Sequence, residues 1–254
     1  MTSANASSPL HGRMTGSSLR LLSVRRPVAG EDDWSDIDLA FRLAPGLEPV
    51  DVGEVWTGWM YENHDVVDHL DVWSGSVLFR VFLLSSSMQV DLSSWPSDTF
   101  AASGRSFRLL FGEANDPKPS PLPAPKTLIG MGWLYALHAR SSIARGRYLQ
   151  ALYMVNGVRD QVVSLACLRY GLPAHQGRGV DDLPREVVKT IADTLVRGLD
   201  PSELSRAFAS AIRALLGEAE QIDPGLALRL REPVRELVRT AAGPRPEQTE
   251  DAAR

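Results

Sequence analysis

Three aspartates stand in two short segments that alternate apolar and polar residues. Asp36 and Asp38 lie in the run WSDIDLAF, and Asp91 lies in the run QVDLSS. Successive side chains of a β-strand point to opposite faces, so Asp36 and Asp38 share one face about 7 Å apart. Two like charges at that spacing repel each other, which a purely structural strand has little reason to keep. A bound divalent cation would remove this repulsion.

Asp91 repeats the pattern on a later segment, where Gln89, Asp91 and Ser93 point one way and Met88, Val90 and Leu92 the other. If this strand lies beside the first, Asp91 completes a cluster of three carboxylates. Such oxygen ligands suit Mg²⁺. Two ions held there could organise a triphosphate and lower the pKa of an attacking hydroxyl, with Asp91 nearest to accept its proton. The alternative is a solvated edge strand whose charges protect it from aggregation.

The elements that must position these aspartates can be outlined from periodicity and breakers. Residues 1 to about 30 show little periodicity beyond a short apolar patch near Leu19 to Val24. The patterns predict a helix over 50–64 and strands over 34–42, 68–73, 76–84 and 88–94. Five prolines in the eleven residues 115–125 indicate a linker. Amphipathic helices follow over 128–144, 148–170, 184–197, 202–219 and 226–239.

We therefore expect an α+β chain with a mixed-sheet domain followed by an all-α helical domain. The sheet domain spans 1–114, a proline-rich linker 115–126, the helical domain 127–242 and a frayed tail 243–254. A net charge of −4 with mixed signs argues against extended nucleic-acid binding. The N-terminus lacks a signal peptide's apolar segment and no apolar run spans a membrane, so we expect a cytoplasmic protein with no membrane partner.

The two aspartate segments resemble the nucleotidyltransferase domain of the DNA polymerase β superfamily. WSDIDLAF is followed about fifty residues later by QVDLSSWP, and the order of strand, helix, strands and a late lone aspartate is that of the superfamily. The helical runs LIGMGWLYALHARSSIARGR and VRDQVVSLACLRYGLP are similar to those of a bacterial group related to aminoglycoside and lincosamide nucleotidyltransferases. The resemblance implies a nucleotidyltransferase-like fold, with Asp36, Asp38 and Asp91 as metal ligands and catalytic residues.

The resemblance also implies a nucleotide cradle. The superfamily places Gly-Ser at a helix start shortly before Asp-x-Asp, where backbone N–H groups hold phosphates. The upstream pair here is Gly16-Ser17, which we assign to nucleotide binding together with Ser35. Eighteen residues separate Ser17 from Asp36, more than the family usually leaves. Related proteins also tend to carry an acid where this chain has Leu152, which would leave Asp91 as the only base.

Other candidates are weighed against structural roles. Arg140, Arg145, Arg147 and Arg159 could neutralise phosphate charge or face solvent, with Asp160 as a partner of Arg159. His69 and Asp71 share a strand face that we expect near the acidic site, where a hydrogen-bonded structural histidine is the better interpretation. Trp56 and Trp59 have the spacing of core residues. Cys167, the single cysteine, sits in an apolar run and is interpreted as buried filler.

These inferences predict a Mg²⁺-dependent enzyme that moves a nucleoside monophosphate from an NTP, with ATP as first candidate, to a hydroxyl of a small molecule. The resistance enzymes of the family make an aminoglycoside-like acceptor one candidate. An alternative is a degenerate domain that binds nucleotide or a protein partner without turnover, which the displaced Gly-Ser favours. A third is one half of a toxin–antitoxin pair that modifies its partner. The acceptor, the base preference and the oligomeric state stay open.

Overall fold

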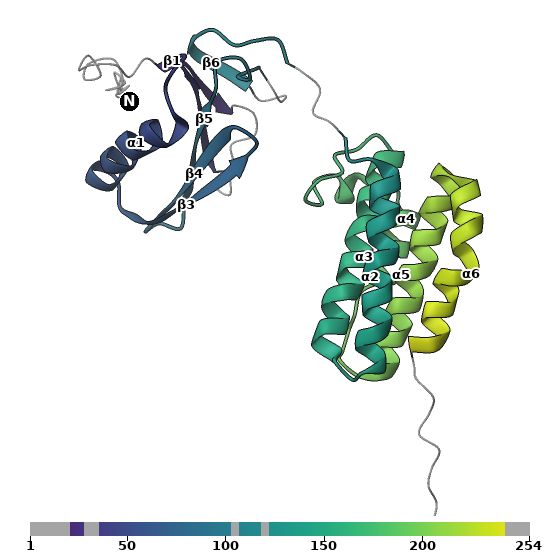
Figure 1. The fold of residues 1–254 in the computed structure, drawn as a ribbon. Helices are drawn as coiled ribbons and strands as arrows, with labels where there is room; N and C mark the ends of the chain where they lie inside the picture. Colours follow the sequence, from purple (N-terminus) through teal and green to yellow (C-terminus); the bar gives the residue numbers. More distant parts are fainter. Residues whose placement is uncertain (1–20, 28–35, 103–106, 118–121, 242–254) are drawn as a thin grey trace, which may run out of the picture. The chain divides into compact units, whose positions relative to one another are not determined.

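The computed structural model describes residues 21–27, 36–102, 107–117 and 122–241. The chain divides into two compact units, Met1–Ser120 and Pro121–Arg254, and Figure 1 shows a sheet in the first and a helical bundle in the second. The α+β class expected from the sequence, with a mixed sheet and then helices, is confirmed. The domain bounds given above stay a prediction.

The first unit is built on a six-stranded sheet whose order is β3-β4-β5-β2-β1-β6. Its strands are β1 (Leu21–Pro27), β2 (Ile37–Leu43), β3 (Val66–Ser74), β4 (Val77–Leu84), β5 (Gln89–Trp95) and β6 (Phe107–Gly112). The pairing of β2 with β5 is parallel, and the other neighbours are antiparallel. A parallel pair needs a long crossover, which α1 (Pro49–Asn63) and the β3–β4 hairpin supply.

The core of this unit lies between the sheet and α1. The Trp56 ring of α1 stacks on Phe41 of β2 with centroids 4.9 Å apart. The other buried members of this core come from the same helix and from three central strands: Leu43, Val52, Met60, Phe82, Val90 and Leu92. Trp56 is buried, as its spacing predicts, whereas Trp59 is 38% exposed and lies at the margin of the core. The apolar face of α1 thereby fixes which face of the sheet is covered and which face carries Asp38 and Asp91.

Two strands were not predicted from the sequence. β1 forms in the N-terminal stretch where we saw only an apolar patch, and β6 was not separated from the strands before it. The two strands pair with each other, with Val24 opposite Phe111. The paired residues of β1 and β6 are at least 80 positions apart in the chain, so no local pattern reveals the pairing. The first strand was also predicted to begin at Trp34, whereas β2 begins at Ile37 and Asp36 directly precedes it.

A buried arginine fastens α1 to β3 and β4. Arg80 of β4 is 3% exposed and donates from Nε and Nη2 to the two carboxylate oxygens of Asp71, at 2.6 and 2.7 Å. Its Nη1 donates to Thr57 at 2.7 Å and Glu54 at 3.1 Å, both on α1. A Cβ at Gly53 would lie 3.1 Å from Nη1, so glycine there lets the helix approach. The Arg80 guanidinium holds the pKa of Asp71 below its ordinary value.

Replacing Arg80 should therefore weaken the first unit. We expect Arg80→Leu to lower the free energy of unfolding by roughly 2–4 kcal/mol, because Asp71 and Thr57 both lose the buried guanidinium that donates to them. Chemical denaturation measures it. The control Glu54→Gln removes only a 65% exposed partner and should cost less than about 1 kcal/mol. Equal losses for the two variants would show that the buried pairing contributes little.

The second unit is a bundle of long helices with a short fourth helix. It contains α2 (Pro125–Ala144), α3 (Tyr148–Arg169), η2 (Val180–Asp182), α4 (Arg185–Ala192), α5 (Pro201–Ile222) and α6 (Pro224–Ala241). Proline occupies the first turn of α2, α5 and α6, where its missing N–H costs no hydrogen bond. A Cβ at Gly157 of α3 would lie 2.7 Å from the Tyr135 ring of α2, so glycine allows these helices to pack closely.

The core of the bundle confirms one prediction and corrects another. Cys167 of α3 is fully buried, and burial raises the pKa of its thiol, as expected for structural filler. The helix predicted over 184–197 is wrong at its end, since α4 stops at Ala192. The physical reason is a set of side-chain contacts that hold residues 193–197 against α5.

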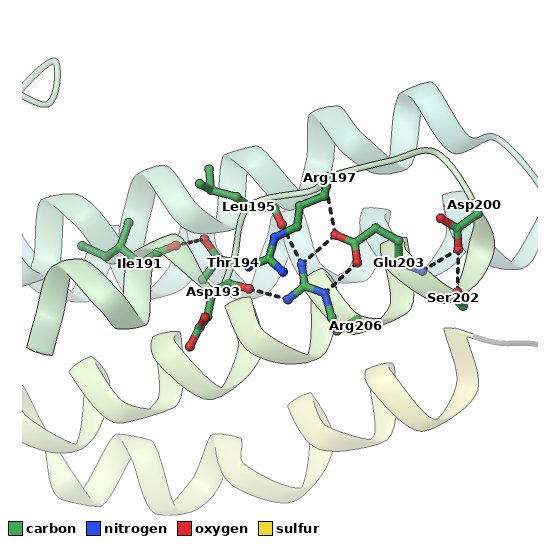
Figure 2. Close-up of polar contacts among 9 residues, drawn as sticks. All are labelled: Ile191, Asp193, Thr194, Leu195, Arg197, Asp200, Ser202, Glu203 and Arg206. Carbon is green, nitrogen blue, oxygen red and sulfur yellow. Dashed lines mark hydrogen bonds and ion pairs between the residues drawn. The ribbon is translucent and has the colours of Figure 1, made fainter.

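Arg206 of α5 makes these contacts (Figure 2). Its Nη1 donates to the backbone oxygen of Asp193 and its Nη2 to that of Leu195, both at 2.7 Å. Arg206 also pairs with Glu203 at 2.7 Å, and a Glu203 oxygen accepts the backbone N–H of Arg197 at 2.9 Å. Arg206 lowers the pKa of Glu203 to about 2. The contribution of ionised Glu203 to stability is therefore fully present above the ordinary pKa of a glutamate, and it is lost only as the pH falls through about 2.

Replacing Arg206 should release this loop without unfolding the bundle. In Arg206→Ala, we expect the amide of Arg197 to exchange hydrogen faster, because Glu203 loses the partner that orients it. Hydrogen–deuterium exchange read at residue resolution tests this. Arg213→Ala is the matched control, since Arg213 is an exposed arginine of the same helix and should leave the exchange of Arg197 unchanged. An unchanged rate in Arg206→Ala would contradict the assignment.

Candidate metal centre

The register of the parallel pair places two of the predicted aspartates side by side. Asp38 of β2 lies opposite Asp91 of β5. Asp36 directly precedes β2, and each of the three aspartates offers a carboxylate oxygen within 4.8 Å of the others. The structure therefore brings together the three carboxylates that the sequence singled out. Asp36 is exposed, while Asp38 and Asp91 are half-buried.

The environment of Asp91 disfavours its ionised form. Burial raises the pKa of this carboxyl above its ordinary value, and the charges of Asp38 and Asp36 raise it further. The hydrogen bond from Gln89 acts in the opposite direction. Desolvation and two like charges both destabilise the ionised form of this carboxyl. Such an arrangement is what a cation would stabilise.

Gln89 orients Asp91. Its Nε2 donates to Asp91 Oδ1 at 2.9 Å, from the same face of the same strand two residues earlier. Oδ1 of Asp91 thereby accepts one hydrogen bond. Its other lone pair and the second oxygen, Oδ2, can still bind a cation. The sequence placed Gln89 on the face of Asp91 by strand alternation but gave it no role. An amide two positions from a ligand on one strand is the signal that could have found it.

The donor set fits a hard divalent cation. Its three groups are carboxylates, the ligands that Mg²⁺, Ca²⁺ and Mn²⁺ take in proteins. Two ligands on opposite sides of one Mg²⁺ ion lie roughly 4.2 Å apart, and those of Ca²⁺ roughly 4.6–5.2 Å apart. The three carboxylate oxygens lie within 4.8 Å of one another, which is compatible with one such ion or with a pair of ions that share the carboxylates.

The remaining predicted site residues have different outcomes. Gly16, Ser17 and Ser35 lie outside the described residues. His69 and Asp71 are not beside the acidic site, because Asp71 pairs with Arg80 on the face that packs against α1. The reason is strand alternation: Arg80 lies opposite Leu92, whereas its neighbour Val81 lies opposite Asp91.

Structural roles account for several other candidates. His69 Nδ1 is hydrogen-bonded to the hydroxyl of Tyr61 at 3.1 Å, which supports the structural interpretation. Arg159 donates to Asn156 and pairs with Asp160, the partner proposed for it. Arg140, Arg145 and Arg147 lie at the end of α2 and in the turn before α3. Leu152 packs against the core of the bundle.

The described chain thus joins a mixed sheet with a carboxylate cluster to a helical bundle. No family model and no curated protein matches the sequence. Among solved structures, one match is an aminoglycoside 6-adenyltransferase from Bacillus subtilis. The two share 12% sequence identity with a TM-score of 0.42, over 86% of this chain and 92% of that one. A similarity of this size carries neither an activity nor a substrate across to this chain.

One further property concerns membranes. Across the part of the chain that the structure describes, no helix combines the length and the apolar character that a membrane crossing requires.

The acidic cluster makes a testable prediction about stability. We expect Asp91→Asn to raise the melting temperature of the metal-free protein, because a desolvated carboxylate beside two like charges is removed. The same change should abolish stabilisation by Mg²⁺ or Mn²⁺, which the native chain should show. Differential scanning calorimetry with and without the metal measures both effects.

Asp68→Asn is the matched control, because Asp68 is an exposed aspartate of β3 outside the cluster. This variant should keep the stabilisation by metal.

The pH dependence of metal binding follows from the raised pKa of Asp91. Since the pKa of Asp91 is raised, protons compete with the metal at a higher pH than for an ordinary aspartate, and metal affinity should fall as the pH is lowered through that value. A metal response that survives in Asp91→Asn would contradict the assignment.

Proposed function

We propose that the first unit is a divalent-metal-dependent nucleotidyltransferase that moves a nucleoside monophosphate from an NTP to a hydroxyl of a small molecule. The observation that carries the proposal is the convergence of Asp36, Asp38 and Asp91 from two neighbouring parallel strands. Mg²⁺ and ATP are the metal and the nucleotide that we propose. The family resemblance of the two aspartate segments supports this choice over other chemistry at a carboxylate cluster.

Each aspartate has a task in this reaction. Asp36 and Asp38 would hold the divalent ions, which when bound stabilise charge on the triphosphate and lower the pKa of the acceptor hydroxyl. Asp91 would also bind metal and accept the proton of that hydroxyl. Gln89 keeps the Asp91 carboxylate in one orientation through the bond to Oδ1. Gly16, Ser17 and Ser35 are proposed to contact the phosphates.

The atoms and electrons of this transfer balance without any reactant besides the NTP and the acceptor. The acceptor oxygen forms a bond to the α-phosphorus, and the bond from that phosphorus to the bridging oxygen of the β-phosphate breaks. Pyrophosphate leaves with the electron pair of the broken bond, and the acceptor proton passes to Asp91. The carboxylates do not form a covalent intermediate in this scheme. Asp91 returns its proton to solvent before the next turnover.

Pyrophosphate release tests the proposal. With ATP, Mg²⁺ and a panel of hydroxyl acceptors (sugars, nucleosides and aminoglycosides), we expect the native chain to release pyrophosphate. Asp91→Asn should lower that rate by roughly 10²–10⁴-fold, the contribution of a positioned base, or further because a metal ligand is also lost. Asp51→Asn, at an exposed position of α1 outside the acidic cluster, should keep the native rate.

A different pattern would favour the binding domain described above. ATP and Mg²⁺ would then stabilise the protein in a thermal melt, while no acceptor of the panel yields pyrophosphate. If neither metal nor any nucleoside triphosphate stabilised the protein, both the enzyme and the nucleotide-binding domain would be ruled out. The melt and the release assay therefore separate the two functions.

A further inference from the structure

The sheet face that carries Asp91 continues across β4 and β3 as an apolar surface. Val81 of β4 lies opposite Asp91, and Leu70 of β3 lies opposite Val81. Alternation puts the residues two positions away on the same face. This apolar patch consists of Leu70, Val72, Phe79, Val81 and Leu83.

The patch is open to solvent. Leu70, Leu83 and Val72 are 64%, 48% and 45% exposed, and Phe79 and Val81 are half-buried. Single exposed apolar residues are ordinary, but a contiguous group next to polar residues marks a binding surface. These residues are contiguous, because Val72 lies opposite Phe79 and Asp68 opposite Leu83 in the same ladder. Asp68 is the one charged side chain in this grid of six positions.

Along β2 and β5, the positions that follow the aspartates on this face are buried. Ala40 of β2 and Ser93 of β5 follow Asp38 and Asp91 along their strands, and they are only 4% and 6% exposed. Trp95 Nε1 donates to Ser93 Oγ at 2.9 Å. The Trp95 ring also meets Phe79 edge to face, with centroids 6.0 Å apart. A molecule whose hydroxyl reaches Asp91 therefore has open, apolar sheet toward β4 and β3.

Charge also limits what such a molecule can be. The five patch residues are uncharged, and the neighbouring Asp68, opposite Leu83, contributes one negative charge. A polycationic acceptor would find little to hold it there. A molecule with an apolar ring or hydrocarbon body would bury that body on the patch.

We propose that the apolar patch binds the body of the acceptor, and that the acceptor is a hydroxyl compound with an apolar ring or chain. This inference rests on the proposed function for the meaning of "acceptor", but binding to the patch can be measured without turnover. It narrows the acceptor to a class distinct from aminoglycosides. The five patch residues and the open face beside Asp91 carry it.

Methyl NMR on the full chain tests binding. Phenyl β-D-glucoside, methyl β-D-glucoside and kanamycin are titrated with Mg²⁺ and a non-hydrolysable ATP analogue present. We expect the phenyl compound to shift the methyl signals of Leu70, Val72, Val81 and Leu83, with at least tenfold tighter binding than the methyl compound. Equal binding of the two glucosides, no shift from either, or saturation of the patch by kanamycin alone would overturn the proposal.

Two variants of one strand give the matched comparison. Leu70→Asn should weaken the phenyl compound about tenfold, the factor that burial of roughly 55 Å² of apolar surface produces. Trp73→Asn replaces a 51% exposed residue of β3 on the opposite face, since Trp73 pairs with Leu78, which lies near Gly53 of α1. It should leave that binding unchanged. Equal weakening in both variants would point to general damage to β3 and overturn the assignment.

The outcomes separate this inference from the proposed function. If the phenyl compound binds the patch but no pyrophosphate is released from ATP with any acceptor, the enzyme proposal fails and the patch remains a binding surface. If kanamycin is modified and Leu70→Asn does not alter its rate, the enzyme stands and the inference fails. Sedimentation covers a second copy as occupant: a dimer that Leu70→Asn dissociates would also overturn the inference.

Discussion

The parallel pairing of β2 with β5 sets Asp38 directly beside Asp91. Asp36, which directly precedes β2, lies close to both. Three carboxylates held within 4.8 Å of one another repel, and the half-buried Asp91 is also poorly solvated. This repulsion is a cost that the rest of the unit must offset. A slip of one residue between the strands would turn Asp91 to the other face and bury its charge against α1. The register is therefore the constraint on which the site depends.

The other face of the sheet fixes that register. Phe41, Val90 and Leu92 bury there against Trp56 and Met60 of α1, so the strands cannot slip without exposing this core. Arg80 adds a directional contact, because its guanidinium must reach Asp71 on β3 and Thr57 on α1 together. Apolar burial and the Arg80 hydrogen bonds therefore both hold the strands in register. The acidic face is thus stabilised by contacts that do not involve it.

One sheet face then combines two kinds of surface. In the row that runs from β3 to β2, Leu70 and Val81 are followed by Asp91 and Asp38, so apolar and acidic positions meet between β4 and β5. The carboxylates provide ligands for a cation, and the apolar positions provide area for a molecule beside it. Gln89 links the two, since it lies next to Leu83 and donates to Asp91.

The amino-acid sequence by itself determined the features that depend on local periodicity. The alternation in DIDLAF and QVDLSS placed each aspartate on the polar side of its strand, and the proline starts and apolar spacing indicated the helices. The tertiary structure decided whatever depends on distant partners. β1 becomes a strand by pairing with β2 and β6, and β6 by pairing with β1. Helix α4 ends early because Arg206 of another helix binds the following carbonyls, and Asp71 pairs with Arg80 rather than joining the acidic site. Local patterns report the direction of a side chain, but only the folded chain brings a partner within hydrogen-bond distance of it.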